Sequence, residues 1–580
     1  MALINQTKMK LTLFKRIKMK KENLFAALAA IVLLGFSACD DKNNDPTPAP
    51  PTMTSISISG AEKDFVADLT FNEGVYNNID KTGDLVKTSF EVTVTGGTAT
   101  LVDFTLSHTA GKTVANFNLN LSDYPSGDET VKIIPASATS IFNATGQAMS
   151  ANQSQEGSFT GNIITIADNG NGTGTTTWTA NNTYLLQGLV FVNDGQVLTI
   201  EAGTVIKGKP GQGEEASALI VARGGKIMAD GTASAPIIFT AEADDLNGSV
   251  ADIDDGLWGG LIVLGKAILN TVPNEQQIEG IPQTEPRGIY GGSNDNDNSG
   301  VIKYVSIRHG GTDIGEGNEI NGLTLGGVGS QTVIDYVEVI ANKDDGVEFF
   351  GGKPNLSHIV VAFCGDDSYD YDQGYRGNGQ FWAAIQGFDR GDRLGEHDGG
   401  TDPESGEPYA IPTIYNVTYL GRGEGAGKRV ITFRDNAGGH YVNSIFYNQE
   451  KGIDIELLVD QCSYTQFSNE NLTIKNNIFY AIGTDPIFKV SVGDGIDPAV
   501  EEEANSTIAA YFASASNEIY DPGFNVTAEK FNIVPTNNVG TNMAPVPGDV
   551  FFQTVNYKGA FEPGNNWTHG WTLVSKYIED

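Results

Sequence analysis

Hydrophobic and polar residues alternate with a period of two between residues 53 and 158. The alternation is clearest over residues 55–59, 90–94, 117–121 and 131–134, and turn residues separate these stretches. A period of two places successive side chains on opposite faces of a strand. We therefore predict a small β-sandwich of immunoglobulin-like form over residues 53–158, acting either as a spacer or as a second binding module.

From about residue 160 the pattern changes to short apolar runs, each closed by Gly, Asn or Asp, and this pattern repeats. Residues 335–339 reappear 22 positions later as residues 357–361, and the same shift superposes residues 344–349 on residues 366–371. One coil of a parallel β-solenoid has about this length, and coils must stack because a single coil cannot bury its inner face. We predict such a solenoid over residues 160–490.

The remaining residues, 491–580, are predicted to form a C-terminal cap with one short helix. Residues 501–520 begin with three glutamates, which stabilise a helix N-terminus. We expect this helix and residues 567–571 to cover the end of the solenoid, where strand edges would otherwise be exposed. The predicted fold class is therefore all-β, a parallel β-helix preceded by a small β-sandwich. Glycine at 70 of 580 positions agrees with many tight turns.

The first 38 residues have the composition of an export signal. A basic stretch precedes the apolar residues 24–36, and Ser37 and Ala38 precede Cys39. An apolar run of this length is too short to span a bilayer permanently. The small residues before Cys39 resemble a bacterial lipobox, which implies a signal peptide over residues 1–38 and lipidation of Cys39, with ordinary cleavage as the alternative. Residues 39–52, acidic and then proline-rich, would form an extended tether.

The charge balance excludes one class of partner. The chain carries 36 basic and 72 acidic residues, a formal charge of −36, and removal of residues 1–38 makes the charge −42. A surface this negative repels phosphate backbones, so we expect no nucleic-acid partner. No stretch after Cys39 reaches 18 consecutive apolar residues, so the lipid on Cys39 is the only membrane attachment that we expect.

The repeat resembles that of the pectate-lyase-like right-handed parallel β-helix. Two segments, residues 366–377 and 557–572, are similar to a family of Bacteroidota surface lipoproteins that share this fold and have no settled activity. This resemblance implies a lipoprotein of the outer membrane that faces the extracellular side. The acidic residues after Cys39 would then be its surface-export signal. We also expect a monomer.

Stacking of the coils predicts which side chains become neighbours and therefore which groups can act together. Equivalent positions on adjacent coils lie about 4.8 Å apart, so acidic residues one repeat apart become neighbours. Like charges at this spacing repel by about 3 kcal/mol at an effective dielectric constant near 20. Ca²⁺, which prefers oxygen ligands, would relieve this repulsion, and so would open solvent around an acidic face. The candidate metal ligands are Asp344, Asp345, Glu348, Asp366, Asp367 and Asp370.

Aromatic residues near the acidic repeat are candidates for sugar binding. Aromatic faces can stack on neutral sugar rings, but packing in the core is the alternative explanation for such residues. Arg376 lies beside the acidic repeat in the sequence and could act as a base. The candidate ligand-binding residues are Trp258, Tyr375, Arg376, Phe381 and Trp382.

Taken together, these patterns predict a cell-surface lipoprotein that binds an extracellular polysaccharide or a surface protein without catalysis. A Ca²⁺-dependent polysaccharide lyase or glycoside hydrolase of the β-helix type is the alternative, and an architectural envelope or adhesion protein is the third. We name no catalytic residue, because the Asn-Thr-Asp, Gly-His-Gly and Arg-Ile-Lys motifs of pectin hydrolases are absent. The six histidines show no zinc-ligand spacing.

Overall fold

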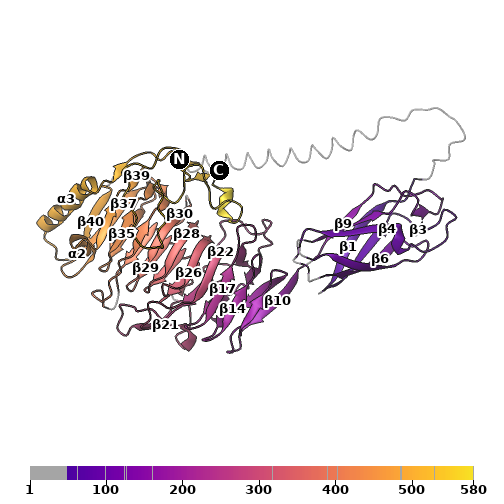
Figure 1. The fold of residues 1–580 in the computed structure, drawn as a ribbon, viewed down its shortest axis with the longest axis horizontal. Helices are drawn as coiled ribbons and strands as arrows, with labels where there is room; N and C mark the ends of the chain where they lie inside the picture. The colour runs from indigo at the N-terminus through magenta and orange to yellow at the C-terminus, as the bar shows by residue number, and fades with distance from the viewer. Residues whose placement is uncertain are drawn as a thin grey trace, which may run out of the picture.

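The computed structural model describes residues 49–578, apart from residues 62, 98, 123–124, 126, 128, 160, 316–317, 388, 401–402, 484–485 and 528. The predicted signal peptide and Cys39 lie outside the described residues. A β-sandwich and a right-handed parallel β-helix follow one another along the chain, which confirms the predicted fold class. The sandwich lies beyond one end of the β-helix, and helix α3 lies at the other end (Figure 1).

The sandwich consists of two antiparallel sheets that face each other across a hydrophobic core. One sheet has the order β1(Met53–Ala61), β2(Asp64–Phe71), β6(Val114–Leu121), β5(Leu101–Ser107), and the other has the order β4(Phe90–Thr95), β7(Thr130–Pro135), β9(Gln155–Ser158). The short strands β3(Val75–Tyr76) and β8(Phe142–Asn143) pair with each other. Alternate residues of β2 and β6 point into the core, as the period of two requires.

Two long parallel sheets form the wall of the β-helix. The first sheet contains β10(Asn162–Ala167), β11(Thr176–Trp178), β12(Asn182–Gln187), β14(Val197–Ile200), β15(Val205–Gly208), β17(Lys226–Asp230), β18(Ile237–Ala241), β22(Gly300–Arg308), β26(Val333–Ile340), β28(Asn355–Ala362), β30(Asn378–Ile385), β32(Thr413–Tyr415), β33(Thr418–Gly423), β35(Gly439–Val442), β36(Ile445–Gln449), β38(Leu472–Lys475), β39(Ile478–Tyr480) and β41(Glu518–Ile519). The second sheet contains β13(Leu189–Val192), β16(Ala218–Val221), β19(Leu261–Leu264), β25(Leu323–Gly326), β27(Val347–Phe350), β29(Tyr369–Asp372), β31(Gly395–Asp398), β34(Arg429–Arg434), β37(Lys451–Leu457) and β40(Phe488–Val492).

The strand register reproduces the repeat seen in the sequence. Asp335 pairs with Ser357 between β26 and β28, and Glu348 pairs with Asp370 between β27 and β29, so each residue pairs with its equivalent in the next repeat. Side chains that alternate with these outward residues fill the interior, where Phe349 and Tyr371 are almost fully buried. Two successive coils of equal length place each apolar side chain directly above its equivalent in the preceding coil.

Corner residues in the left-handed conformation bend the first sheet. The long strands β22, β26, β28 and β30 each contain one residue with a φ between 47° and 61°, and later coils place an asparagine there with a φ between 54° and 57°. The corner residues are Tyr304, Tyr336, His358, Phe381, Asn416, Asn443 and Asn476. The aromatic corners stack on one another, with ring centroids 4.2 to 4.8 Å apart.

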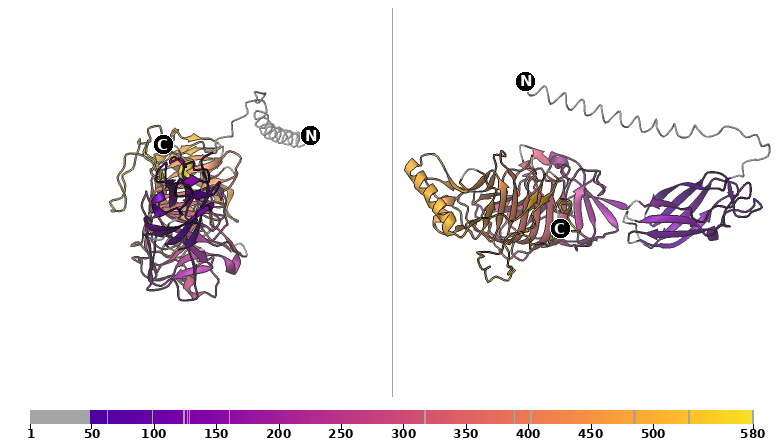
Figure 2. Two further views of the ribbon diagram at one scale, coloured as in Figure 1. Left: turned by 90° about the vertical axis from the view of Figure 1, so that its right-hand side faces the viewer. Right: turned by 90° about the horizontal axis from the view of Figure 1, so that it is seen from above.

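The C-terminal part of the chain covers both the end and one flank of the β-helix. Helix α3(Pro498–Ser514), capped by Asp497, packs Ala504 and Ile508 onto the last coil, and the short helix α2(Ser463–Ser468) lies nearby. Residues 521–578, here called the strap, return along the flank toward the earlier coils (Figure 2). The strap includes the hairpin β42(Asn525–Val526) and β43(Phe531–Asn532) and the 3₁₀ turn η4(Val574–Lys576).

The predicted role of residues 567–571 as an end cap is therefore wrong. The edges of Trp567 and Trp571 pack against the aromatic corners Tyr336 and Tyr304, because the outward apolar residues of the first sheet also need cover. No helix among the described residues is long and apolar enough to cross a membrane.

A second covering segment shields the early part of the second sheet. The hairpin β20(Glu275–Gln277) and β21(Ile289–Gly291) and its flanking residues place Leu269, Ile278 and Tyr290 over the outward residues of β16 and β19. The remaining described elements are the 3₁₀ turns η1(Lys87–Ser89), η2(Gly213–Glu215) and η3(Pro286–Gly288) and the small pair β23(Asp313–Gly315) and β24(Asn318–Glu319). From β27 onward the outer face of the second sheet becomes polar, and this face carries the candidate site.

Candidate functional site

An acidic row runs along the outer face of the second sheet. Glu348 of β27 pairs with Asp370 of β29, and Asp370 pairs with Glu396 of β31. The neighbours of these residues along each strand point inward, so the three carboxylates point outward on successive coils. Because equivalent positions of successive coils stack, residues that are distant in the sequence form a row of like charges.

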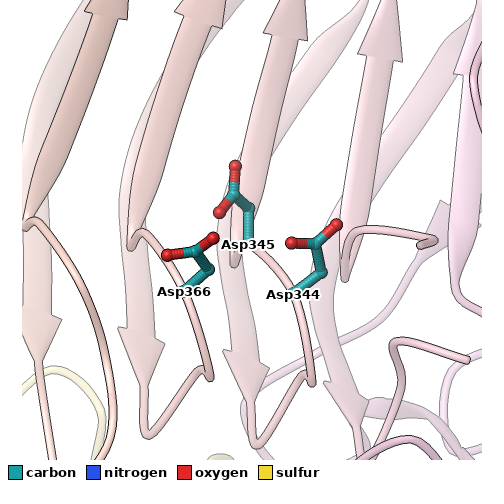
Figure 3. A group of neighbouring side chains, drawn as sticks. All are labelled: Asp344, Asp345 and Asp366. Carbon is teal, nitrogen blue, oxygen red and sulfur yellow. The ribbon is translucent and has the colours of Figure 1, made fainter. Parts of the chain in front are cut away.

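The turns that precede these strands add further carboxylates. Asp344, Asp345 and Asp366 each offer an oxygen within 4.8 Å of the others, and Figure 3 shows their side chains next to one another on two successive turns. Asp345, Glu348 and Asp370 form a second group with the same spacing. The structure therefore brings together the residues predicted as metal ligands. With Asp367, which follows Asp366 and is buried, they are called the acidic cluster.

Hydrogen bonds satisfy only part of the acidic cluster. The Asp345 carboxylate accepts a hydrogen bond of 2.8 Å from the Asp367 backbone N–H, and the Glu348 carboxylate accepts one from the Asn321 amide. One Asp370 oxygen is enclosed and has no hydrogen-bond partner among the described residues. Enclosed oxygens without partners are rare in folded proteins, and this one lies where a proton or a cation would be stabilising.

Burial changes the ionisation of these groups. Burial raises the pKa of Asp345, Glu348 and Asp370 well above the usual range of carboxylic acids, and the neighbouring carboxylates raise each pKa further. A low-dielectric environment disfavours the charged form of an acid, and so do like charges nearby. The folded chain therefore binds protons on this face more tightly than the unfolded chain does, unless a bound cation replaces them.

Two arginines neutralise the carboxylates farther along the face. Glu396 lies 2.9 Å from Arg393 and 3.0 Å from Arg434, and Arg434 also binds Asp398 through hydrogen bonds of 2.7 and 2.9 Å. We call Arg393 and Arg434 the arginine pair. Burial raises the pKa of the adjacent Asp435 to about 7, with a further contribution from Asp398. In the described part of the chain, the face thus has one end with arginines and one end, at Glu348 and Asp370, without them.

The predicted aromatic platform does not exist. Trp258, Tyr375 and Trp382 are at most 1% exposed and belong to the interior of the β-helix, and Phe381 is a corner residue beneath the strap. The Trp258 and Trp382 ring N–H groups donate to backbone carbonyls inside the fold. We correct the expectation accordingly, because a buried ring has no face left for a sugar.

Arg376 is likewise committed elsewhere. Its guanidinium lies 2.5 Å from Asp295 and donates to the backbone carbonyls of Ile268 and Gly374. These contacts fix the hairpin segment against the coil, and they correct the prediction that Arg376 acts beside the acidic cluster.

Sequence reasoning missed Glu396, Asp398 and the arginine pair. Asp370 and Glu396, which pair in the sheet, lie farther apart in the sequence than one repeat, because this coil carries a longer connection than its predecessor. A search at the fixed shift of the repeat therefore passes over these residues. A search that allowed a longer shift would have found one signal, a second strand with acids at alternate positions, Glu396 and Asp398.

The donors of the acidic cluster suit a hard divalent cation. They consist of carboxylate oxygens from two coils, with protons as the alternative occupants. Of these carboxylates, Asp367 also lies 3.4 Å from Arg393. The same face could also hold polyhydroxylated ligands, whose hydroxyls donate to carboxylates and accept from guanidinium groups. Both kinds of ligand agree with an outward, partly desolvated polar surface.

The comparisons with known proteins identify the fold family. The sequence profile described as "Pectate-lyase like beta helix domain" matches residues 170–572. No curated protein matches the chain. Among solved structures, the catalytic domain of a GH87 α-1,3-glucanase in complex with tetrasaccharides is 10% identical, with 77% of this chain and 98% of that chain covered and a TM-score of 0.22.

Two further structures are similar at the same level. The GH87 α-1,3-glucanase catalytic domain in complex with nigerose is 10% identical, with coverage of 76% and 97% and a TM-score of 0.18. The catalytic unit of the thermostable GH87 α-1,3-glucanase from Streptomyces thermodiastaticus is 10% identical, with coverage of 77% and 87% and a TM-score of 0.17. TM-scores this low carry no information about activity. The profile match covers more than half of the chain, and the chain therefore belongs to the family of pectate-lyase-like β-helix domains.

Proposed function

We propose that this protein is a lipid-anchored surface protein that binds an extracellular glycan on the outer face of its second sheet, together with a divalent cation. The observation that carries the proposal is the in-register row of Glu348, Asp370 and Glu396 beside the turn carboxylates. Closely spaced carboxylates with an enclosed, unpartnered oxygen at Asp370 destabilise the fold, so their presence on an outward surface favours a role in binding.

The cation belongs at the end of the face that lacks the arginine pair. Asp344, Asp345 and Asp366 lie close enough for their oxygens to share one ion, and so do Asp345, Glu348 and Asp370. Ca²⁺ fits this donor set best, because it accepts six to eight oxygen ligands in flexible geometry. When bound, the ion would supply positive charge and open coordination positions for ligand hydroxyls or carboxylates.

The arginine pair would hold the other end of the ligand. Arg434 is 40% exposed and Arg393 is 25% exposed, so both reach solvent while their partner carboxylates fix their orientation. Guanidinium groups held in this way donate to ligand oxygens with little loss of conformational entropy. A glycan that lies across successive coils would therefore contact the cation first and the arginines next.

The cellular setting belongs to the same proposal. We place the protein at the outer membrane of a Bacteroidota cell, attached through a lipid on Cys39 and facing outward, on the basis of the export signal and the tether sequence. The strongly acidic surface suits an extracellular protein that has to remain soluble near a membrane.

Retention on immobilised polysaccharides, with and without Ca²⁺, tests the proposal. We expect the wild-type chain to bind at least one glycan in Ca²⁺, to lose about tenfold in affinity in chelator, and to lose a similar factor in Asp370→Asn. Asp230→Asn removes an exposed carboxylate outside the acidic cluster and serves as the matched control. Equal retention of wild-type and Asp370→Asn proteins would contradict the proposal.

One observation favours a second candidate, glycoside hydrolysis. Asp370 has an unpaired buried oxygen and a pKa that burial raises, whereas its strand neighbour Glu396 touches two arginines, so two carboxyl groups in different environments lie side by side. Hydrolases of glycosides use a pair of this kind. New reducing ends on incubation with a retained glycan would support this candidate over pure binding. Retention without new ends supports binding, and inertness in both assays supports an architectural role.

A further inference from the structure

The sandwich domain carries a hollow that the proposed function does not use. The hollow has a volume of about 450 Å³ and lies on the outer face of the sheet β1-β2-β6-β5. A bulge between Leu101 and Asp103 in β5 shifts the strand register beside it. Its outward lining residues are Asp64, Val66, Asp103, Thr105, Asn118 and Asn120.

Short polar side chains occupy this face in cross-strand rows. Asp64 and Asp103 both pair with Asn120, and Val66 and Thr105 both pair with Asn118. The Asn118 amide donates to the Thr105 hydroxyl at 3.2 Å, which fixes the orientation of the amide. Because the side chains of these rows are all short, they leave the backbone between the strands accessible to a ligand.

The choice of residues runs against strand propensity. Asparagine and aspartate are depleted in strands, yet β6, an inner strand, carries Asn116, Asn118 and Asn120 on its outer face. Threonine, lysine or glutamate would keep the surface soluble at lower conformational cost. Residues that run against strand propensity at consecutive outward positions of a central strand are typical of a binding surface.

The chemistry of the lining selects one class of ligand. An anion would meet Asp64 on a chain whose net charge is already strongly negative. Val66 is the only apolar side chain among the outward lining residues, since Phe65, Phe104 and Leu119 point into the core, and the Asp103 carboxylate is already paired with Lys87. Carboxylates and amides that alternate at strand spacing instead match adjacent hydroxyl groups, which both donate and accept hydrogen bonds.

We propose that this hollow is a second binding site, for a neutral saccharide, so that the sandwich is a binding module and not only a spacer. Its volume lies within the range of small-ligand sites. Two sites on one chain would raise the avidity for a polysaccharide above the affinity of either site alone.

Binding of the full chain to unsubstituted gluco-, galacto- and manno-oligosaccharides in chelator tests this proposal. Chelator removes the cation and so prevents Ca²⁺-dependent binding at the acidic cluster. We expect measurable binding by wild-type protein, and a loss of about tenfold or more in Asn118→Ala with Asn120→Ala. Asn116→Ala removes a matched amide on the same strand that is outside the hollow, and it should bind as wild type does. Thermal melts of each variant identify losses that come from unfolding, and Asn118→Asp keeps the side-chain shape in case the double variant does not fold.

The outcomes distinguish this site from the proposed site at the acidic cluster. Asp370→Asn should leave binding in chelator unchanged, so a loss in that variant would overturn the assignment to the sandwich. Unchanged binding in both the double variant and Asn118→Asp would overturn it as well, and so would the absence of binding to every oligosaccharide of the panel. Failure of the Ca²⁺-dependent retention alone would overturn the proposed function and leave this site intact.

Discussion

At the residue scale, position within a coil decides how each carboxylate behaves. Asp345 and Glu348 are buried with raised pKa values, whereas Glu396, on the same outward row, lies between two arginines. The same functional group therefore binds protons more tightly at the buried end of the face and pairs with arginines at the other end. Local sequence reveals only part of this difference, because Arg393 lies three residues before Glu396 whereas Arg434 comes from the next coil.

The raised pKa values predict a pH dependence of stability. In chelator, Asp345, Glu348 and Asp370 bind protons more tightly in the folded than in the unfolded chain, so stability falls as pH rises from about 4 toward their raised pKa values. Each group removes up to about 1.4 kcal/mol per pH unit in that window. Urea unfolding at a series of pH values above 4 measures the effect, and comparison with Asp370→Asn at each pH cancels the contribution of His397, whose pKa burial lowers to about 3.

Asp370→Asn should weaken this pH dependence, since the amide does not titrate. The same dependence of stability on pH in chelated wild-type and Asp370→Asn proteins would show that Asp370 titrates alike in the folded and unfolded chain, against our expectation.

A cation should reverse the effect of pH on the same groups. At pH 8 we expect added Ca²⁺ to raise the melting temperature of the wild-type chain by several degrees, because about 2 to 3 kcal/mol of binding energy acts on the folded state alone. Asp344→Asn with Asp370→Asn should abolish the shift. These isosteric variants are preferable to changes at Asp367, which is 1% exposed and accepts the Arg393 backbone N–H. An identical melt in Ca²⁺ and in chelator would rule out the cation.

At the element scale, the corners and the strap explain how the β-helix closes its flank. Asn416, Asn443 and Asn476 each donate their side-chain amide to a backbone carbonyl of the strap, at 2.7 to 2.8 Å. Outward apolar residues such as Phe363 and Leu420 pack beneath the same segment. The corner positions thus serve both the bend of the sheet and the attachment of the C-terminal residues.

Two substitutions at one corner separate these roles. Asn443→Gly keeps the left-handed backbone but loses both hydrogen bonds with Ala544, and should cost about 1 to 3 kcal/mol. Asn443→Ala should cost about 1 kcal/mol more, because a Cβ disfavours a positive φ. Equilibrium unfolding in urea measures both values. Equal losses in the two variants would mean that the backbone conformation contributes nothing there.

Glu338 is the buried attachment point of the strap. Its carboxylate is fully buried and accepts the backbone N–H groups of Leu573 and Val574 at 3.0 and 2.7 Å. Glu338→Ala leaves both donors unpaired, so we expect a loss of about 2 to 5 kcal/mol and faster hydrogen exchange in residues 560–578. Glu529→Ala, at an exposed strap position, is the control. Unchanged exchange in Glu338→Ala would show that the strap is held elsewhere.

The coils could be predicted from the sequence, but the segments that cover them could not. The shift between repeats superposed Glu348 on Asp370 because both coils have equal length, and the structure has the same pairing. Trp382, by contrast, pairs with Ile359 over a longer stretch of chain than one repeat, so the fixed shift did not reveal that it points inward. The strap could not be predicted, because its contacts join residues such as Glu338 and Val574 that lie 236 positions apart.

At the scale of the whole molecule, the chain combines a sandwich with a β-helix, and we propose that a lipid on Cys39 anchors both at the cell surface. The anchor rests on the sequence around Cys39 alone. We expect Cys39→Ser to abolish incorporation of labelled fatty acid and to move the protein from the membrane to the soluble fraction. The full-length wild-type chain treated in parallel is the control. Membrane retention of the serine variant at wild-type level would contradict lipid anchoring.

Hydrogen exchange of the full chain with a retained glycan and Ca²⁺ shows where on the β-helix the ligand lies. We predict that the glycan slows exchange in β27, β29 and β31 and in the turns that carry Asp345 and Asp366, and that Asp370→Asn removes this protection. Protection confined to the first sheet or to the strap, with the second sheet unaffected, would contradict it.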